Sequence, residues 1–237
     1  LFGGGRDGYV GMAGGFGTRL KPLTNECPKP LLKIGGKPVL ENIIESCRRN
    51  GLTKFYISVH YKADMIMNYF GDGSSLGVDI KYIQESSPLG TGGALGLISQ
   101  INHPLVVMNG DVLTSVDFSQ LLSFHINTKA DATICVREHE LQVPYGVVQT
   151  NDYRFVTIVE KPTHHFFINA GLYVLSPQVV NDLRESKRFD MPDLLDQLVM
   201  DKKQVVMFPV HEYWLDMGRL DDLKQAELDI YDRFNRG

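Results

Sequence analysis

A chain of 237 residues with 43% hydrophobic and 22% charged residues has the composition of a globular protein and can bury a full core. Its formal net charge of −4 gives no basic field for nucleic acid, and no apolar run approaches the ~20 residues of a membrane span. Its three cysteines are odd in number and widely spaced, which argues against a disulfide framework and for a reducing compartment, the cytoplasm.

Residues 1–8, LFGGGRDG, have the glycine-rich composition of a flexible linker. From residue 9 onward, strand and helix patterns alternate. The segment GYVGMA at 8–13 predicts a short first strand. A helix is predicted from Pro38, because apolar residues recur on one face at Val39, Leu40, Ile43, Ile44 and Cys47.

The same alternation continues along the next part of the chain. Helices are predicted at 63–70 and 90–101, and strands at 54–61, 79–85 and 104–111. The last strand is a near-continuous apolar run, which is typical of a strand buried on both faces of a parallel sheet. Asp117 is expected to cap a further helix whose apolar face carries Phe118, Leu121, Leu122 and His125.

This β-α-β-α order predicts an α/β fold with a doubly wound, mostly parallel (Rossmann-like) sheet and right-handed crossovers. After a strand at 130–138 the order changes. A hairpin at 145–162 turns at its Thr-Asn-Asp sequence, and a strand follows near 166–177. Two helices, a strand at 204–210 and a final helix from about Leu220 complete the chain.

We expect one domain over residues 9–237, because no linker composition divides it. A nucleotide-type half covers about residues 9–128. The other half, at about 129–237, loses the regular alternation of strands and helices. It is expected to add strands and to form a C-terminal lobe that is a second wall beside the nucleotide-type half.

The glycine-rich segment at 11–38, GMAGGFGTRLKPLTNECPKPLLKIGGKP, matches neither common phosphate-binding fingerprint. A P-loop needs Ser or Thr after its Gly-Lys pair, but Gly36-Lys37 is followed by Pro38. A dinucleotide loop needs a third glycine where this chain has Leu20. The segment nevertheless follows a strand, so it lies at the carboxyl edge of the sheet, where open α/β sheets bind ligands.

The residue types of this segment suit an anion. Its glycines allow backbone N–H groups to approach phosphate closely, and they include Gly14, Gly15 and Gly17. Arg19 offers a planar fork to phosphate oxygens, and Lys29 lies between two prolines that restrict its backbone. The alternative, a structural turn with solvated cations, stays open for these residues taken alone.

The sequence MAGGFGTRL…PKPLL…GKP resembles the signature of the sugar-1-phosphate nucleotidylyltransferases. The similarity continues in order through PLGTGGAL, VMNGD, PYGVV, VEKP, NAGLYVL and YWLDMGR, from Met12 to the final helix. It implies the nucleotide-diphospho-sugar transferase fold, with the sugar phosphate bound by the C-terminal half. It also implies a reaction in which an NTP and a sugar 1-phosphate give an NDP-sugar and pyrophosphate, with Mg²⁺.

The motif PLGTGGAL is more similar to that of guanylyltransferases, so the resemblance favours GTP with a mannose-like or amino-sugar 1-phosphate. The sequence alone fixes neither the base nor the sugar. The chain looks similar to the module that follows paired CBS domains in some proteins, so fusion to an upstream regulatory domain is one expectation. Many relatives assemble through a C-terminal β-helix that this chain lacks, so an oligomer is open.

Two carboxylates are candidates for the metal. Asp111 in VMNGD and Asp216 in WLDMG each follow an apolar run, and hard carboxylates suit Mg²⁺, which usually takes one or two protein acids. Either aspartate alone could equally cap a helix. The resemblance makes them the metal pair.

The resemblance assigns the catalytic cations as well. Arg19 and Lys29 hold the triphosphate, and Lys161 in EKP meets the sugar phosphate, although an isolated Lys161 would be read as a surface side chain. A phosphate monoester has a second pKa near ~6 and is a dianion at neutral pH, so no general base is required. Positioning and charge neutralisation are then the catalysis.

The remaining positions carried over by the resemblance fall into two sets. The nucleotide set consists of Ala13, Gly14, Gly15, Gly17, Thr18, Gln84, Gly90 and Thr91. The sugar set consists of Tyr145, Gly146, Glu160, Asn169 and Gly171, with Tyr145 expected to pack rather than to react. Thr91 is also a fair candidate for a helix cap.

Two other functions stay open at this point. One is a sensor that binds a nucleotide sugar without turnover and regulates an attached module. The other is nucleotidyl transfer to a non-sugar phosphate such as phosphocholine. The presence of Arg19, Lys29, Asp111, Lys161 and Asp216 together favours the sugar-1-phosphate enzyme.

Overall fold

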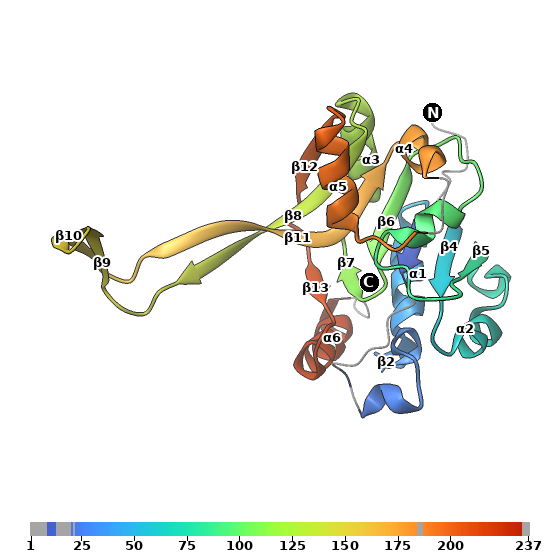
Figure 1. Ribbon diagram of the computed structural model, residues 1–237. Coiled ribbons are helices and arrows are strands. Elements are labelled where there is room, and N and C mark those ends of the chain that lie inside the picture. The colour runs from blue at the N-terminus through green and yellow to red at the C-terminus, as the bar shows by residue number, and fades with distance from the viewer. Residues whose placement is uncertain (1–8, 13–19, 21, 184–186, 234–237) are drawn as a thin grey trace.

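The computed structural model describes residues 9–12, 20, 22–183 and 187–233. It shows a body made of a twisted sheet with helices on both sides, and a long two-stranded extension that leaves this body (Figure 1). Among the described residues, no helix is both long enough and apolar enough to cross a membrane.

The central sheet contains seven strands among the described residues, in the order β12-β8-β11-β6-β1-β4-β5. They are β1 (Tyr9–Met12), β4 (Lys54–Val59), β5 (Asp79–Gln84), β6 (Leu105–Asn109), β8 (Ala132–Gln142), β11 (Thr163–Leu175) and β12 (Val205–Pro209). The neighbours β5-β4-β1-β6 and β8-β12 are parallel, and β11 runs antiparallel to both β6 and β8. The mostly parallel sheet expected from the sequence is confirmed.

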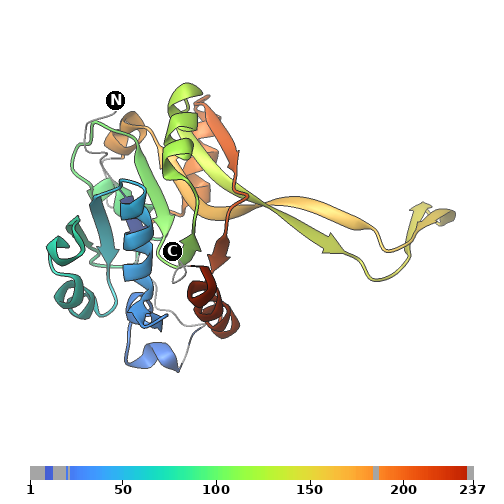
Figure 2. The same ribbon diagram turned by 180° about the vertical axis from the view of Figure 1, so that it is seen from behind.

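Helices cover both faces of this sheet (Figures 1 and 2). They are α1 (Val39–Arg49), α2 (Ala63–Phe70), α3 (Phe118–Asn127), α4 (Pro177–Asp182), α5 (Met191–Met200) and α6 (Leu220–Arg233). Short elements connect them: the strands β2 (Lys33–Ile34), β3 (Lys37–Pro38), β7 (Val112–Thr114) and β13 (Trp214–Asp216), and the 3₁₀ turns Leu23–Asn25, Lys29–Leu31, Ser74–Leu76 and Gly93–Leu97.

The core lies in two layers, one on each face of the sheet, because successive side chains of a strand point to opposite faces. In β6, Val106 and Met108 join the layer under α1, α2 and α3, whereas Leu105 and Val107 join the layer under α4 and α5. All four side chains are at most 1% exposed. The doubly buried strand that the apolar run predicted is therefore confirmed, as is the doubly wound architecture.

Two helix predictions had opposite outcomes. Asp117 caps α3 as expected, since its Oδ1 accepts the backbone N–H groups of Ser119 and Gln120 at 2.8 and 3.1 Å. The helix expected at 90–101 is wrong, because only the 3₁₀ turn Gly93–Leu97 forms there. Glycines make a helix costly in this segment, and Gly90 has a φ of +78°, outside the helical region.

The strands β8 and β11 pair along most of their length, with a register irregularity between Asn169 and Tyr173, but they are buried over only part of it. From Ala132 to Val136 and from Ala170 to Leu175 they belong to the central sheet. Beyond these residues the pair continues outward and ends in a second ladder, β9 (Val147–Asn151) with β10 (Arg154–Val159). We call residues 137–169 the arm. It projects from one side of the body in both ribbon views (Figures 1 and 2).

Candidate active site at the carboxyl edge of the sheet

The parallel strands place their carboxyl ends along one edge of the body. Met12, the last residue of β1, is in register with Ser58 of β4 and Asn109 of β6. The carboxyl end of β1 therefore lies directly beside the end of β6, which precedes Asp111. The predicted phosphate-binding residues Ala13, Gly14, Gly15, Gly17, Thr18 and Arg19 lie outside the described residues.

Asp111 and Asp216 come from strands that pair with each other. Asp216 ends β13 and is in register with Val112 of β7, the residue after Asp111. The backbone N–H of Met217 donates to the carbonyl oxygen of Asp111 at 2.9 Å. Two acids separated by more than a hundred positions in the sequence thus lie on adjacent backbones at the same edge.

Lys29 reaches this point from the segment after β1. It begins the 3₁₀ turn Lys29–Leu31 directly after Pro28, whose φ of −65° and ψ of 145° direct the chain into the turn. Its Nζ lies 2.6 Å from Oδ2 of Asp111, and the two side chains are only 13% and 29% exposed. A charge-assisted contact this short, partly shielded from water, fixes both side chains. We call Lys29, Asp111 and Asp216 the body cluster.

Asn169 and Gly171 lie at the root of the arm, next to this edge. Asn169 accepts the N–H of Gly171 at its Oδ1, and its Nδ2 donates to the hydroxyl of Tyr173 at 2.6 Å. Burial raises the pKa of Tyr173, so this hydroxyl stays protonated. Gly171 packs so closely on Asn109 that an added Cβ would come within 2.6 Å of the Nδ2 of that side chain. Both predicted sugar-binding residues therefore lie beside the segment that carries Asp111.

The other predicted sugar-binding residues gather in the outer part of the arm, between the β8–β11 ladder and the β9–β10 ladder. The backbone N–H of Lys161 donates to the carbonyl oxygen of Tyr145 at 3.3 Å. The Glu160 carboxylate packs on Gly146, where an added Cβ would come within 2.9 Å of Oε1. We call Tyr145, Gly146, Glu160 and Lys161 the tip cluster.

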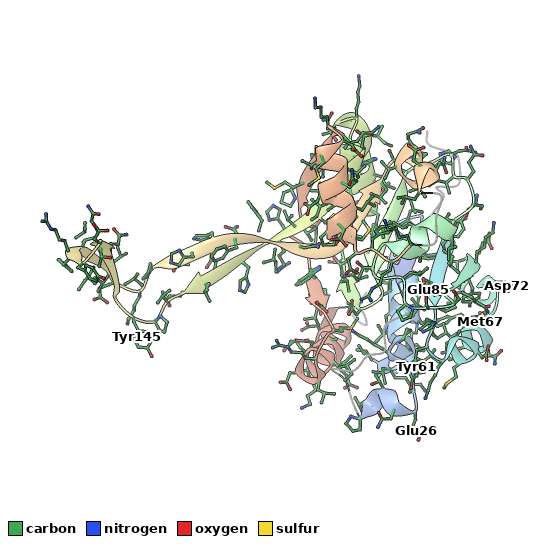
Figure 3. The ribbon with its side chains drawn as sticks, in the orientation of Figure 1. Glu26, Tyr61, Met67, Asp72, Glu85 and Tyr145 are labelled. Carbon is green, nitrogen blue, oxygen red and sulfur yellow. The ribbon has the colours of Figure 1, made fainter. Side chains whose placement is uncertain are left out.

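The body cluster and the tip cluster do not meet within one chain. Figure 3 shows Tyr145 on the outer part of the arm, on the opposite side of the molecule from Glu85 and Met67. Seven successive residue pairs of β8 and β11, from Val136↔Asn169 to Gln142↔Thr163, separate the tip from the body. The structure thus brings the predicted site residues together in two groups rather than in one.

The residues predicted to meet the base have protein partners. The Thr91 backbone N–H and hydroxyl both donate to Oδ1 of Asp190, at 2.8 and 3.1 Å, and the same hydroxyl accepts the N–H of Met191 at 2.9 Å. Thr91 therefore ties its loop to the start of α5. The Nε2 of Gln84, at the carboxyl end of β5, donates to Sδ of Met67 at 3.3 Å.

Two acidic residues that sequence reasoning does not single out support this loop. Asp190 precedes α5 and forms a capping box with Asp193, whose carboxylate accepts the backbone N–H of Asp190. The spacing of these two acids before an apolar run is a helix-start pattern, and this pattern could have indicated Asp190 from the sequence. Glu85 follows β5, accepts the N–H of Leu89 at 2.9 Å and accepts the hydroxyl of Ser58. Nothing in the local pattern around Glu85 indicates these contacts.

The donor set at the body cluster fits a hard divalent cation. Mg²⁺ commonly takes one or two protein carboxylates and fills its remaining positions with water and phosphate oxygens. Asp111 and Asp216 supply such a pair, and Asp111 already holds the cationic Nζ of Lys29. Within the described residues there is no cluster of three or more His, Cys, Asp or Glu side chains that would suit a softer or fully protein-ligated metal.

Comparisons with known proteins agree in family and in fold. The family profile described as nucleotidyl transferase matches residues 10–233. A mannose-1-phosphate guanylyltransferase of Mycobacterium tuberculosis is 34% identical over 230 residues, which are 93% of this chain and 64% of that protein. A D-glycero-α-D-manno-heptose 1-phosphate guanylyltransferase of Aneurinibacillus thermoaerophilus is 33% identical over 223 residues, which are 92% of this chain and 96% of that protein.

Solved structures are similar over nearly the whole chain. HddC from Yersinia pseudotuberculosis has a TM-score of 0.72 and 30% identity, covering 94% of this chain and 98% of that one. A second structure of HddC is a complex with GMP-PN. This chain spans 60–64% of the length of the mannose-1-phosphate guanylyltransferases that it matches.

Proposed function

Because this chain belongs to the nucleotidyl transferase family, we propose that it transfers a nucleoside monophosphate from an NTP to a sugar 1-phosphate. GTP is the proposed nucleotide and a sugar of the mannose type the proposed acceptor, with an amino sugar as the alternative. The relatives named for GTP and for mannose or manno-heptose 1-phosphates support this choice. The observation that carries the proposal is the contact of Lys29 with Asp111 beside Asp216, at the edge where the chain enters the glycine-rich segment.

The proposed reaction needs no proton to move. A phosphate oxygen of the sugar 1-phosphate attacks the α-phosphorus of the NTP, a new P–O–P bond forms, and the bond from the α-phosphorus to the bridging oxygen of the β-phosphate breaks. Pyrophosphate leaves with that electron pair. The barrier comes from bringing two polyanions together and from the charge that moves onto the leaving group.

The body cluster is proposed to manage this charge. Asp111 and Asp216 would hold Mg²⁺, which supplies positive charge to the phosphate oxygens when it is bound. Lys29 adds a second positive charge at the same place, because its contact with Asp111 keeps its ammonium group there. Arg19 and the glycines before it are proposed to hold the triphosphate.

The sugar side is proposed to use two groups of residues. Asn169 and Gly171 present polar groups at the root of the arm, and Glu160 and Lys161 do so at its tip. A carboxylate and an amide can pair with sugar hydroxyls, and a site built in this way rejects analogues that lack them.

We propose a cytoplasmic location for the protein, since all three cysteines lie in described segments and carry free thiols.

A panel assay tests the proposal. Purified protein is incubated with each of the four common NTPs and with mannose, glucose, glucosamine or manno-heptose 1-phosphate, with Mg²⁺ or with EDTA. Pyrophosphate release is measured, and we expect it with GTP and a manno-configured acceptor and expect EDTA to abolish it. Absence of release for every pairing contradicts the enzyme, and binding of a GDP-sugar without turnover would then favour the sensor.

The Asp111→Asn variant tests the metal assignment. We expect kcat to fall on the order of 100-fold or more, because a carboxylate that holds the cation is lost. Asp79→Asn is the matched control, since Asp79 begins β5 and therefore lies at the opposite edge of the sheet. Circular dichroism checks that both variants fold. Undiminished turnover by Asp111→Asn would remove Asp111 from the metal site.

A further inference from the structure

The arm is an extended ladder without a core of its own. Many of its large apolar side chains are exposed, and six of them are between 49% and 74% exposed: Leu141, Tyr145, Val148, Phe155, Ile158 and Phe166. An isolated two-stranded ribbon is marginally stable in water, and exposed apolar patches of this kind mark interaction surfaces. The arm therefore has no core to pack on among the residues that the structure describes.

One face of the ladder is more apolar than the other. Cross-strand pairing puts Phe166 opposite His139 and His164 opposite Leu141, so these four side chains share one face. On the opposite face His165 contacts Glu138 and Glu140 at 3.0 and 3.5 Å, and the exposed Phe167 pairs with Glu138. The first face thus carries two exposed large apolar side chains, Phe166 and Leu141, and the opposite face carries one beside two carboxylates.

In the second ladder one face also gathers large apolar side chains. Val148 is in register with Ile158, and Phe155 pairs with Thr150 two positions further along. Gly146 lies on the same side as Ile158 and Glu160, because an added Cβ there would approach both. The exposed apolar side chains are thus adjacent to the tip cluster, which is the group that the proposed function needs at the body.

We propose that the arm of one copy docks on the body of a second copy of this chain, and that its tip cluster completes the active site of the partner. Each site would then combine Lys29, Asp111 and Asp216 of one chain with Glu160 and Lys161 of the other. This assignment of the tip rests on the proposed function. Because every copy has both an arm and a receiving body, the exchange closes as a two-fold dimer.

The exposed area is sufficient for a dimer. The six side chains named above expose roughly 650 Å² per arm, since one aromatic side chain alone offers about 150–250 Å². Two reciprocal arms would therefore bury about 1,300 Å² from the arm side chains alone, which is within the range of stable specific interfaces. Docking also explains how two groups of predicted site residues, separated by the seven pairs of the ladder, can act on one substrate.

Complementation between two inactive copies tests the shared site. Asp111→Asn and Lys161→Ala chains are co-expressed with different affinity tags, and the heterodimer is isolated by two purification steps. One of its two sites then has an intact body and an intact tip, so we expect about half of the wild-type turnover although each parent is inactive. A heterodimer of Asp111→Asn with Asp216→Asn is the control, because both of its bodies are defective.

Two results of this experiment would overturn the proposal. If the Asp111→Asn and Lys161→Ala heterodimer is as inactive as the control heterodimer, the tip acts within its own chain or not at all. If the Lys161→Ala chain alone keeps wild-type turnover, the tip takes no part in the site.

A second measurement does not depend on activity. Light scattering with size-exclusion chromatography is expected to give a mass twice the 26.6 kDa of the chain at micromolar concentration. Replacing residues 143–162 by an Asn-Gly turn, which joins Gln142 to Thr163, should give a folded monomer. A monomeric wild-type protein that releases pyrophosphate would overturn the docking and leave the proposed function standing. If the wild-type protein is a dimer that the turn variant disrupts, but no NTP and acceptor give turnover, the docking stands and the proposed function is contradicted.

Discussion

The two halves of β11 both pair with β8 but differ in their surroundings, since only the inner half also pairs with β6, at Leu172–Leu175. From Ala170 to Leu175 the side chains are at most 2% exposed, whereas Phe166 and Phe167, only a few positions earlier, are 50% and 59% exposed. Both stretches pair with β8. Forming interstrand hydrogen bonds gives up hydrogen bonds to water, so their net contribution to the free energy of folding is small. Burial of apolar side chains therefore decides which stretch is stable by itself. The body is therefore self-sufficient, and the arm depends on what covers it.

A pair of truncations in the same strand gives the largest expected contrast. Leu172→Ala removes a side chain that is 0% exposed in the core layer under α1, and it should lower the free energy of unfolding by about 2–5 kcal/mol. Phe167→Ala removes a larger side chain that is exposed on the arm and should change it by less than about 0.5 kcal/mol. Urea unfolding followed by circular dichroism measures both, and equal losses would contradict the distinction between body and arm.

A glycine substitution at the junction of the two regions should have an intermediate effect. Gly171→Ala places a Cβ at a φ of +66° and within 2.6 Å of the Asn109 side chain, so we expect a loss of about 2–3 kcal/mol. Gly36→Ala is the matched control, because Gly36 has a φ of +83° but no atom within 4 Å of the added Cβ. Backbone strain alone should cost that control about 1 kcal/mol.

The comparison of the two glycine variants separates strain from collision. Thermal unfolding of both variants under one buffer condition gives the difference between their losses of stability. Because Asn109 is two residues before Asp111, Gly171→Ala should also lower turnover, whereas Gly36→Ala should affect turnover less. A Gly171→Ala variant as stable as Gly36→Ala would show that Asn109 moves aside without cost.

The smallest expected effect concerns pH and the body alone. His125 is buried, its Nδ1 lies 2.8 Å from the hydroxyl oxygen of Thr133, and burial lowers its pKa while Asp131 opposes this shift. As pH falls below about 6.5 the unfolded chain takes up a proton that folded His125 does not accept, so the free energy of unfolding falls. Urea unfolding at pH 7.5 and 5.5 should show a smaller decrease for His125→Gln than for wild type.

Exposed His211 provides the control for this pH effect. His211→Gln should leave the decrease between pH 7.5 and 5.5 unchanged, because it removes an exposed side chain and leaves the buried His125 in place. If His125→Gln and His211→Gln respond alike, the buried imidazole is not the source of the pH dependence.

Local pattern was sufficient to predict most of the body. The helix at 63–70 has the expected bounds, because its apolar face repeats with helical spacing and Gly71 ends it. The helix expected at 90–101 fails for a reason that local pattern does not contain. Thr91 is held by Asp190, 99 positions away in the sequence, and this contact fixes the loop in another conformation.

The sequence indicated that some of the candidate residues lie together, but it did not indicate the arrangement of the two clusters. Lys29 and Asp111 were expected at one edge because both follow strands of the parallel sheet, and they meet at 2.6 Å. The hairpin at 145–162 was also expected, and β9 and β10 form it. Its distance from the body was not, since the direction in which a ladder leaves a sheet depends on what packs against it. The roles of the individual residues stay predictions until variants are assayed.

The register of β8 and β11 ties the length of the arm to the face that its side chains present. Each residue added to both strands would lengthen the ladder by about 3.4 Å and turn every side chain beyond it to the opposite face. Only insertions of two residue pairs would keep Phe166 and its neighbours facing the same way while moving the tip outward by about 7 Å. Chain length between Val136 and Asn169 can therefore change in steps of two pairs without altering which face the arm presents.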